Sequence, residues 1–518
     1  MKPKTLKFRV TRPLVLSLAL LAAPAVQAAG VSTLEPRLST VKPTNPELDS
    51  DTQVERLVVK FHEGTRVRLR GGLMRAMAAE RSQAESAHMQ SRGLNDEKLL
   101  ADLHSAHQVL ERAPRMGPAG RLFRQDELTL AERKRAAEER SGRQMADLDL
   151  YFEVPLLPGA RAGDVEALLA QLNTLESVEI AYAEPLPEPA TVGVDTQPTV
   201  SPYESRQGYL DAAPGGIDAR YAWTVAGGKG TGVKIVDVEG AWNGTHEDLP
   251  SFFHVGGVPF TDSGWRNHGT AVLGELVGQP NASGVTGIVH EAQAGIEGVA
   301  TQSTASAITN AAIAAGPGGI VLVELHAKGP RATPQCTCNV SQCNYIAMEY
   351  WQANFDAIAL ATANGVHVVE AAGNGGTNLD SRRYRGAFDR TVRDSGAILV
   401  GASTATTRAP MCWTNSGGRV DLHGWGESVV TLGYGDLSAS GENQWYTARF
   451  GGTSSAAPMV VGSVASLQGA AHAAGLGLLD PRAVRELLMS TGTPQASSPQ
   501  QIGPLPNLRD ALPRLLAR

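Results

Sequence analysis

The stretch Phe450-Gly451-Gly452-Thr453-Ser454-Ser455-Ala456-Ala457-Pro458-Met459-Val460-Val461-Gly462 joins two glycines to a serine and then to a run of small and apolar residues. The glycines permit a tight turn of the backbone. The residues after them predict a buried helix, apolar nearly all round. Ser454 is therefore expected at a helix N-terminus, where unpaired backbone N–H groups would stabilise negative charge on a substrate oxygen. The alternative is a serine that only caps a buried helix.

Three other stretches place chemically useful side chains at the ends of predicted elements. An apolar run from Gly232 ends in the carboxylate of Asp237, and His268 opens a predicted helix. A second apolar run, His367-Val368-Val369-Glu370-Ala371-Ala372-Gly373-Asn374-Gly375, ends in Gly-Asn-Gly. Each residue also has a purely structural interpretation, as a turn or cap for Asp237 and His268 and as a left-handed turn for Asn374.

In the order Asp, His, Asn, Ser, these stretches resemble the subtilisin-like serine proteases (subtilases). The serine segment fits the family pattern Gly-Thr-Ser-x-Ala-x-Pro, and the histidine segment fits His-Gly-Thr. The resemblance extends from about Gly215 to the C-terminus. It implies an α/β fold in which a parallel sheet carries helices on both faces. It also implies a serine-type endopeptidase that acts through an acyl-enzyme.

The resemblance gives each of the four residues a role. His268 would be the base that removes the proton of Ser454, and Asp237 would hold the imidazole in one tautomer. Asn374 and the Ser454 backbone N–H would donate to the oxyanion. All four can meet at the carboxyl ends of the strands of an open α/β sheet. The alternative function is a catalytically inactive peptide-binding module on the same fold.

The sequence departs from the family pattern at two places. After Asp237 the family has Ser or Thr and then Gly, whereas this chain has Val238-Glu239-Gly240. We expect Glu239 to face solvent, and the alternative is that it disturbs the pKa of the histidine or binds something. His246-Glu247-Asp248-Leu249 matches the family's next landmark. The substrate-binding strand reads Glu324-Leu325-His326-Ala327-Lys328-Gly329 instead of Asn-Met-Ser-Leu-Gly. We expect substrate to add a strand along Leu325, His326 and Ala327, opposite a wall made by Ala371, Ala372 and Gly373.

The N-terminal third has its own organisation. Residues 1–28 have a basic start, a short apolar core and a small-residue cleavage site, as in a secretory signal, and a membrane anchor is the alternative. Residues 29–185 resemble a subtilase inhibitory propeptide of α+β type, with a long helical insertion at about 74–147 of unassigned role. An accessory domain that is never removed is the alternative. Residues 186–209 are interpreted as a linker that contains the maturation cleavage, and 210–518 as the peptidase domain.

The predicted elements of the peptidase domain alternate between strands and helices, which indicates a parallel sheet. We expect strands at 233–238, 285–290, 319–325, 366–372, 396–402 and 427–432. We expect helices at 268–277, 302–315, 346–364, 454–472 and 480–490. In the N-terminal region we expect strands at 54–61, 148–154 and 178–185 and a helix at 164–172.

Composition limits the remaining possibilities. The net charge of −6 over 518 residues is too small to indicate a nucleic-acid partner. Four cysteines in an exported chain allow two disulfides with three pairings, and a zinc site that includes His326 is the alternative. We expect no required cofactor. Subtilases often bind calcium, but no dense Asp loop singles out ligands, so no metal residue is named. The expected product is a secreted or periplasmic monomer. Its partners would be protein or peptide substrates and its own propeptide as inhibitor, without stable membrane association.

Overall fold

The computed structural model describes residues 34–38, 40–43, 47–190, 203–281, 283–330, 336, 338–438 and 440–517. The predicted signal peptide, residues 1–28, and the part of the predicted linker from 191 to 202 lie outside these ranges. Within the described ranges, no helix is both long and apolar enough to cross a bilayer.

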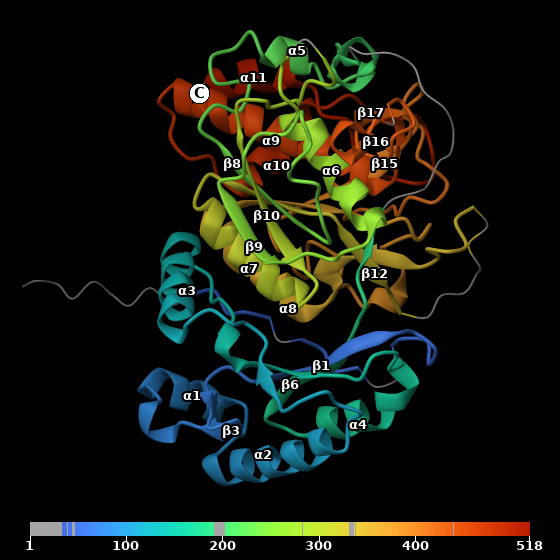
Figure 1. Ribbon diagram of the computed structural model, residues 1–518. Helices are drawn as coiled ribbons and strands as arrows, with labels where there is room; N and C mark the ends of the chain where they lie inside the picture. Colours follow the sequence, from blue (N-terminus) through green and yellow to red (C-terminus); the bar gives the residue numbers. More distant parts are fainter. Residues whose placement is uncertain are drawn as a thin grey trace, which may run out of the picture.

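A seven-stranded parallel sheet forms the centre of the molecule, as predicted (Figure 1). The strand order is β16-β15-β14-β11-β8-β10-β9. Its strands are β8 (Lys234–Glu239), β9 (His254–Val258), β10 (Gln293–Val299), β11 (Ile320–Val323), β14 (His367–Ala371), β15 (Ile398–Ser403) and β16 (Leu422–Trp425). From β8 the chain continues to β9 and β10 and then crosses to β11 on the other side of β8. This reversal places a crevice at the carboxyl ends of β8 and β11.

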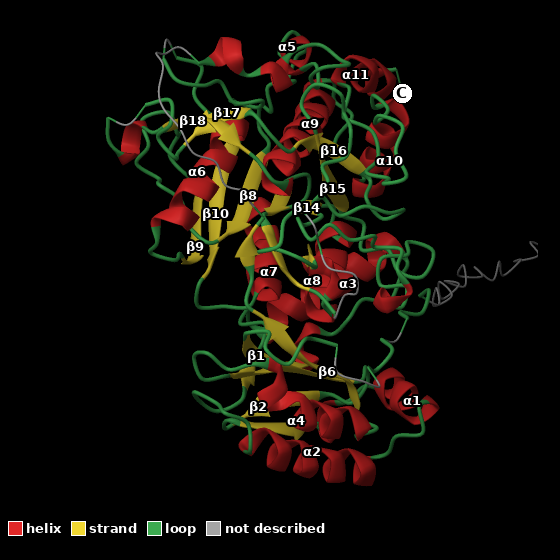
Figure 2. Ribbon diagram, turned by 90° about the vertical axis from the view of Figure 1, so that its right-hand side faces the viewer, coloured by secondary structure: helices red, strands yellow, loops and turns green. Residues whose placement is uncertain are grey.

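Helices cover both faces of this sheet (Figure 2). One face carries α7 (Thr304–Ala315) and α8 (Gln352–Ala363), and the other carries α6 (Ser263–Val277) and α9 (Thr453–Ala473). Further out lie α5 (Ala219–Ala222), α10 (Pro481–Thr491) and α11 (Leu508–Leu516). Ile235 of β8 packs in the α6–α9 core, whereas Val236 and Val238 pack in the α7–α8 core. Because side chains alternate along a strand, Asp237 and Glu239 share the α6–α9 face.

The N-terminal region is an antiparallel four-stranded sheet with the order β4-β5-β1-β6. Its elements are β1 (Val54–Phe61), β2 (Val67–Arg70), β3 (Leu73–Ala76), α1 (Gln83–Ser91), α2 (Asp96–Glu111), β4 (Gly120–Arg121), α3 (Glu127–Ser141), β5 (Tyr151–Pro155), α4 (Ala162–Thr174) and β6 (Val178–Pro185). α4 packs on β6, and α2 packs on α4. Val58, Tyr151 and Ile180 belong to the hydrophobic core that also contains α7 and α8. The region thus lies against the helices of the peptidase region (Figure 1).

The helical insertion predicted at 74–147 is present as α1, α2 and α3. α3 packs on the peptidase region, where Leu130 and Ala137 join the core that contains α8. Gln125, just before α3, also donates to Oδ1 of Asn310 at 2.7 Å. The Asn364 side chain donates to the carbonyl of Arg133 at 3.2 Å across the same contact. The insertion therefore widens the contact between the two regions.

Two small sheets complete the fold. β12 (Leu325–Lys328) lies between β13 (Tyr345–Ala347) and β7 (Glu188–Pro189) and pairs antiparallel with both. β17 (Val429–Leu432) pairs antiparallel with β18 (Tyr446–Phe450), which leads into α9.

One predicted strand is absent, and two predicted elements differ from the structure in their sheet or their bounds. Residues 285–290 form no strand, and β10 follows them instead. The strand predicted at 427–432 belongs to the β17–β18 hairpin, because its partner is the chain that returns to α9. The helix predicted at 346–364 begins at Gln352, since the residues before it complete β13 and a short 3-10 turn. The short strands β9 and β16 were not predicted.

Candidate active site

Ser454 lies in the first turn of α9, as predicted. Gly452, directly before the helix, has a φ of +105°, a conformation that favours glycine. The Ser454 backbone N–H has no partner within the helix and donates to the carbonyl oxygen of Ala190 at 3.3 Å. The Ser454 hydroxyl oxygen is buried and has no hydrogen-bond partner among the described residues.

The imidazole of His268, in α6, is hydrogen-bonded through Nδ1 to Oε1 of Glu239. Gly269 makes this contact possible: a Cβ at that position would lie 2.4 Å from the carbonyl oxygen of Ala241, so glycine lets α6 approach the chain just after β8. Nε2 of His268 is buried and has no hydrogen-bond partner in the described part of the chain. It is the atom that a histidine base uses toward a serine hydroxyl.

Asp237, which was predicted to hold His268, has no hydrogen bond to its imidazole among the described residues, although its charge acts on the pKa of that group. Oδ2 of Asp237 accepts a hydrogen bond from Nε1 of Trp242 at 2.7 Å. The reason is the length of β8, which ends at Glu239 and so places that residue at the rim, two positions beyond Asp237. The expectation that Glu239 faces solvent is also wrong, because its exposed fraction is 0%. In this structure Glu239 occupies the place predicted for Asp237.

The cluster around His268 contains buried carboxyl groups without a Lys or Arg partner. Asp237, Glu239, Glu275 and Glu324 are all buried, and none forms an ion pair with Lys or Arg within the described ranges. Burial raises the pKa of Glu239 well above its ordinary value and lowers the pKa of His268 to about 3. Burial, followed by the charges of Asp237 and Glu239, also raises the pKa of Glu324. The imidazole is therefore neutral, the form that can accept a proton.

Asn374 follows β14 and has its carboxamide fixed at both ends. Its Oδ1 accepts from the backbone N–H of Thr453 at 3.0 Å and from the Thr453 hydroxyl at 2.9 Å, which ties it to the start of α9. Its Nδ2 donates to Oε1 of Gln342 at 3.2 Å. Asn374 and Ser454 are thus neighbours, as predicted. The predicted wall residues Ala371, Ala372 and Gly373 are buried at the end of β14 and just after it, and their role in a substrate pocket stays a prediction.

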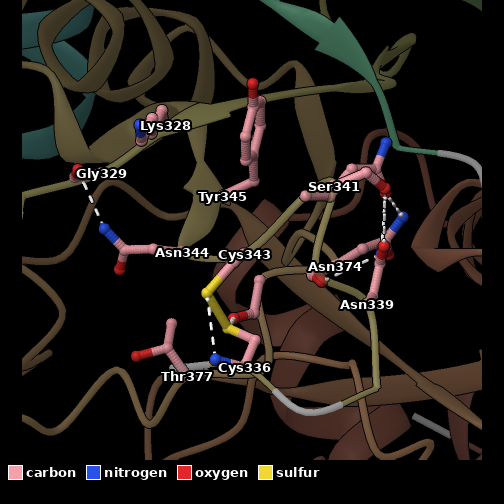
Figure 3. The surroundings of a disulfide bond; sticks show 12 residues. Lys328, Gly329, Cys336, Asn339, Ser341, Cys343, Asn344, Tyr345, Asn374 and Thr377 are labelled. Atoms are coloured by element: carbon pink, nitrogen blue, oxygen red, sulfur yellow. Dashed lines mark hydrogen bonds between the residues drawn. A yellow bond between two sulfur atoms is a disulfide. The ribbon is translucent and has the colours of Figure 1, made fainter. Parts of the chain in front are cut away.

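Gln342 lies on a loop that two disulfides hold in place. Figure 3 shows one of them, between Cys336 and Cys343. Cys336 is bonded to Cys343, and Cys338 to Cys412. Because all four sulfur atoms are in disulfides, they are not available as the zinc ligands of the alternative interpretation. In Figure 3, Asn374 lies beside Asn339 of this loop.

The strand β12, which carries Leu325, His326 and Ala327, is occupied along one edge by the chain's own segment 188–190. β7 pairs antiparallel with it, Pro189 opposite Leu325 and Glu188 opposite His326. The Tyr345 hydroxyl donates to Oε1 of Glu188 at 2.7 Å. With the Ala190 carbonyl at the Ser454 N–H, this segment lies as an added peptide strand would.

Sequence reasoning missed Glu239 and Gln342. Because side chains alternate along a strand, Asp237 and Glu239 lie on the same face of β8. The residue nearer the carboxyl end of a strand lies nearer the site. If the predicted strand had been one residue longer, it would have ended at Glu239 and indicated that residue. No comparable signal points to Gln342, because its position depends on a disulfide pairing that the sequence leaves open.

The chain matches the Subtilase family over residues 245–504. It is 26% identical over 303 residues to "Intracellular serine protease" of Paenibacillus polymyxa, covering 55% of this chain and 81% of that protein. It is 24% identical over 333 residues to "Extracellular protease" of Xanthomonas campestris, covering 57% of this chain and 53% of that protein.

Among solved structures, fervidolysin from Fervidobacterium pennivorans, described as a keratinolytic enzyme related to subtilisin, aligns with a TM-score of 0.53 and 15% identity. The alignment covers 93% of this chain and 64% of that one. At this sequence identity it supports a shared fold and nothing further. The family match spans half of the chain and includes Ser454, His268 and Asn374. This chain belongs to the subtilase family of serine peptidases.

Proposed function

We propose that the chain is a secreted serine endopeptidase made as a zymogen, whose first substrate is its own peptide bond after Ala190. The observation that carries the proposal is the position of segment 188–190. It pairs with β12 and places the Ala190 carbonyl at the N–H of Ser454, where the oxyanion of acyl transfer would form.

The proposed reaction begins with Ser454. Its hydroxyl transfers a proton to Nε2 of His268 as Oγ attacks the Ala190 carbonyl carbon. Glu239, bonded to Nδ1, keeps the imidazole in the tautomer with a free Nε2 and stabilises the imidazolium that forms. The Ser454 backbone N–H donates to the oxyanion, and the carboxamide of Asn374 is the second donor that we propose.

The tetrahedral intermediate collapses when the imidazolium gives its proton to the leaving amine of residue 191. This step breaks the peptide bond and leaves Ala190 as an ester on Ser454. Water, deprotonated by His268, then hydrolyses the ester and restores the hydroxyl. The products are a new amino terminus at residue 191 and a carboxylate at Ala190.

The N-terminal region is, in this proposal, an inhibitory propeptide. While 188–190 occupies β12, no other peptide can add a strand there. The wide contact through α3 and the sheet of β1, β5 and β6 supports an inhibitor that covers the active site until the cut is made. Secretion is supported by the two disulfides and by the extracellular relative, although another relative is named as intracellular.

The full chain, expressed with Ser454→Ala as control, tests the proposal. Wild type should release a fragment that ends at Ala190, as mass spectrometry would show, and the processed protein should be labelled by a fluorophosphonate probe. Ser454→Ala should stay uncut and unlabelled. Absence of both cutting and labelling in the wild type would instead support the peptide-binding module. Cutting in Ser454→Ala would mean that another protease matures the chain.

A further inference from the structure

We propose that Gln342 is a substrate-binding residue that holds the main-chain carbonyl of the residue preceding the scissile one. This inference rests on the proposed function, since segment 188–190 stands for a bound substrate. Nε2 of Gln342 donates to the carbonyl oxygen of Pro189 at 3.1 Å. Ala190, the next residue, has its carbonyl at the Ser454 N–H. Gln342 and Ser454 thus bind consecutive carbonyls of one segment.

The oxygen atom of the Gln342 carboxamide is also hydrogen-bonded. Its Oε1 accepts from Nδ2 of Asn374 at 3.2 Å and from Nδ2 of Asn339 at 3.1 Å. With its oxygen occupied by two donors, the carboxamide must present its NH₂ group toward Pro189. The orientation of the donor is therefore set by the protein and does not depend on the peptide.

The two disulfides make this donor rigid. Gln342 directly precedes Cys343, which is bonded to Cys336, and Cys338 anchors the same loop to Cys412. A carboxamide that is already ordered loses little conformational freedom when a peptide binds, so more of the hydrogen-bond energy appears as affinity. We infer that the disulfides serve this subsite.

The donor recognises a main-chain atom. Every peptide with at least two residues before the scissile bond offers this carbonyl whatever its side chains, including proline, which has no N–H for the strand ladder. The site therefore favours extended peptides over single-residue acyl groups. It adds to the strand pairing along β12, which serves longer segments.

Two ester substrates of different length test whether Gln342 binds the substrate carbonyl or acts in another way. N-acetyl-Glu-Pro-Ala p-nitrophenyl ester has the carbonyl that Gln342 would bind, whereas p-nitrophenyl butyrate has none. Enzyme from self-processed full chain is used, with active sites counted by fluorophosphonate titration. Gln342→Ala should lower kcat/KM for the peptide ester by roughly 3- to 10-fold more than for the butyrate, the loss expected for one neutral hydrogen bond to the peptide carbonyl. Any loss that the two esters share reports the Asn374 carboxamide, which the substitution frees at Nδ2.

Gln342→Glu should lose as much on the peptide ester, because a carboxylate cannot donate. Val340→Ala, on the same loop with a 75% exposed side chain, should change neither value. Retained butyrate hydrolysis shows that each variant is folded. An equal loss on both esters, or no loss on either, would overturn the inference. A wild type that is neither labelled nor active on either ester would instead refute the proposed function.

Discussion

The N-terminal sheet and the candidate active site both bury carboxylates, but the side chains that surround these carboxylates differ. In the sheet, Glu179 is bonded to Nζ of Lys60 and to Arg37, each at 2.7 Å. Burial alone would raise its pKa, yet these two cations hold the pKa of Glu179 well below its ordinary value. In the candidate active site, the imidazole of His268 is the one hydrogen-bond partner of the Glu239 carboxyl group among the described residues, and burial raises the pKa of Glu239.

This difference in partners distinguishes a carboxylate that stabilises the fold from one that takes part in catalysis. A buried carboxylate between two cations stays charged and holds the fold together. A buried carboxylate beside a neutral imidazole can stabilise the positive charge that the imidazole gains when it takes up a proton, which is what a histidine base requires. Burial is the same in both regions, so the partner decides the role.

The largest expected effect is on the rate of self-cleavage, and it distinguishes the roles of Asp237 and Glu239, the two acidic residues of β8. Glu239→Gln should slow self-cleavage of the full chain by about 10³–10⁴-fold, as expected when the group that orients a catalytic histidine is neutralised. Asp237→Asn should slow it by no more than about 10-fold, since it removes a partner of Trp242 and a charge that favours the imidazolium but is not hydrogen-bonded to it. Both rates are read from the appearance of the cut chain on a gel. If Asp237→Asn slowed self-cleavage more than Glu239→Gln, Asp237 would be the residue that orients His268.

A smaller effect, on stability, is expected in the N-terminal sheet, where buried carboxylates are paired with cations. Lys60→Met should lower the free energy of unfolding by about 3–5 kcal/mol, because it leaves Glu179 and Glu63 short of a buried cation. Arg124→Ala, which removes an ion pair whose Arg side chain is 55% exposed, should cost less than about 1 kcal/mol. Urea unfolding of both variants in a Ser454→Ala background gives the two values. Equal effects would mean that the buried network adds nothing.

A third expected effect is on pH dependence. The pKa of His268 is lowered to about 3, so the imidazole stays neutral over the working range. The pKa of Glu239 is raised, so this side chain must lose a proton before it can stabilise the imidazolium. Self-cleavage should therefore slow by about tenfold per pH unit below that raised pKa, and the midpoint should lie above the ordinary value for glutamate.

A pH–rate profile of the full chain, refolded at each pH, measures this dependence. Asp237→Asn should keep the acid limb. A midpoint at or below the ordinary glutamate value would contradict the assignment of the limb to Glu239.

Local patterns in the sequence predicted much of the fold and part of the site. The glycines before Ser454 and the apolar run after it predicted α9, and the strand–helix alternation predicted the parallel sheet. These features depend on neighbouring residues, which the sequence presents directly. The convergence of Asn374 with Ser454 also followed from their places at element ends.

What the sequence did not predict depends on single-residue boundaries and on distant contacts. The end of β8 at Glu239 decides which carboxylate meets His268, and a boundary error of one residue was enough to miss it. β7 is two residues long and is a strand only because β12 lies beside it. Gln342 reaches Pro189 only because two disulfides hold its loop there.

The most direct test of the central claim asks which carboxylate holds the histidine. A proton shared between Nδ1 of an imidazole and a carboxylate gives a far-downfield signal in one-dimensional proton NMR. The Ser454→Ala chain should show this signal, Asp237→Asn in that background should keep it, and Glu239→Gln should lose it. A signal that survives Glu239→Gln and disappears in Asp237→Asn would contradict the account.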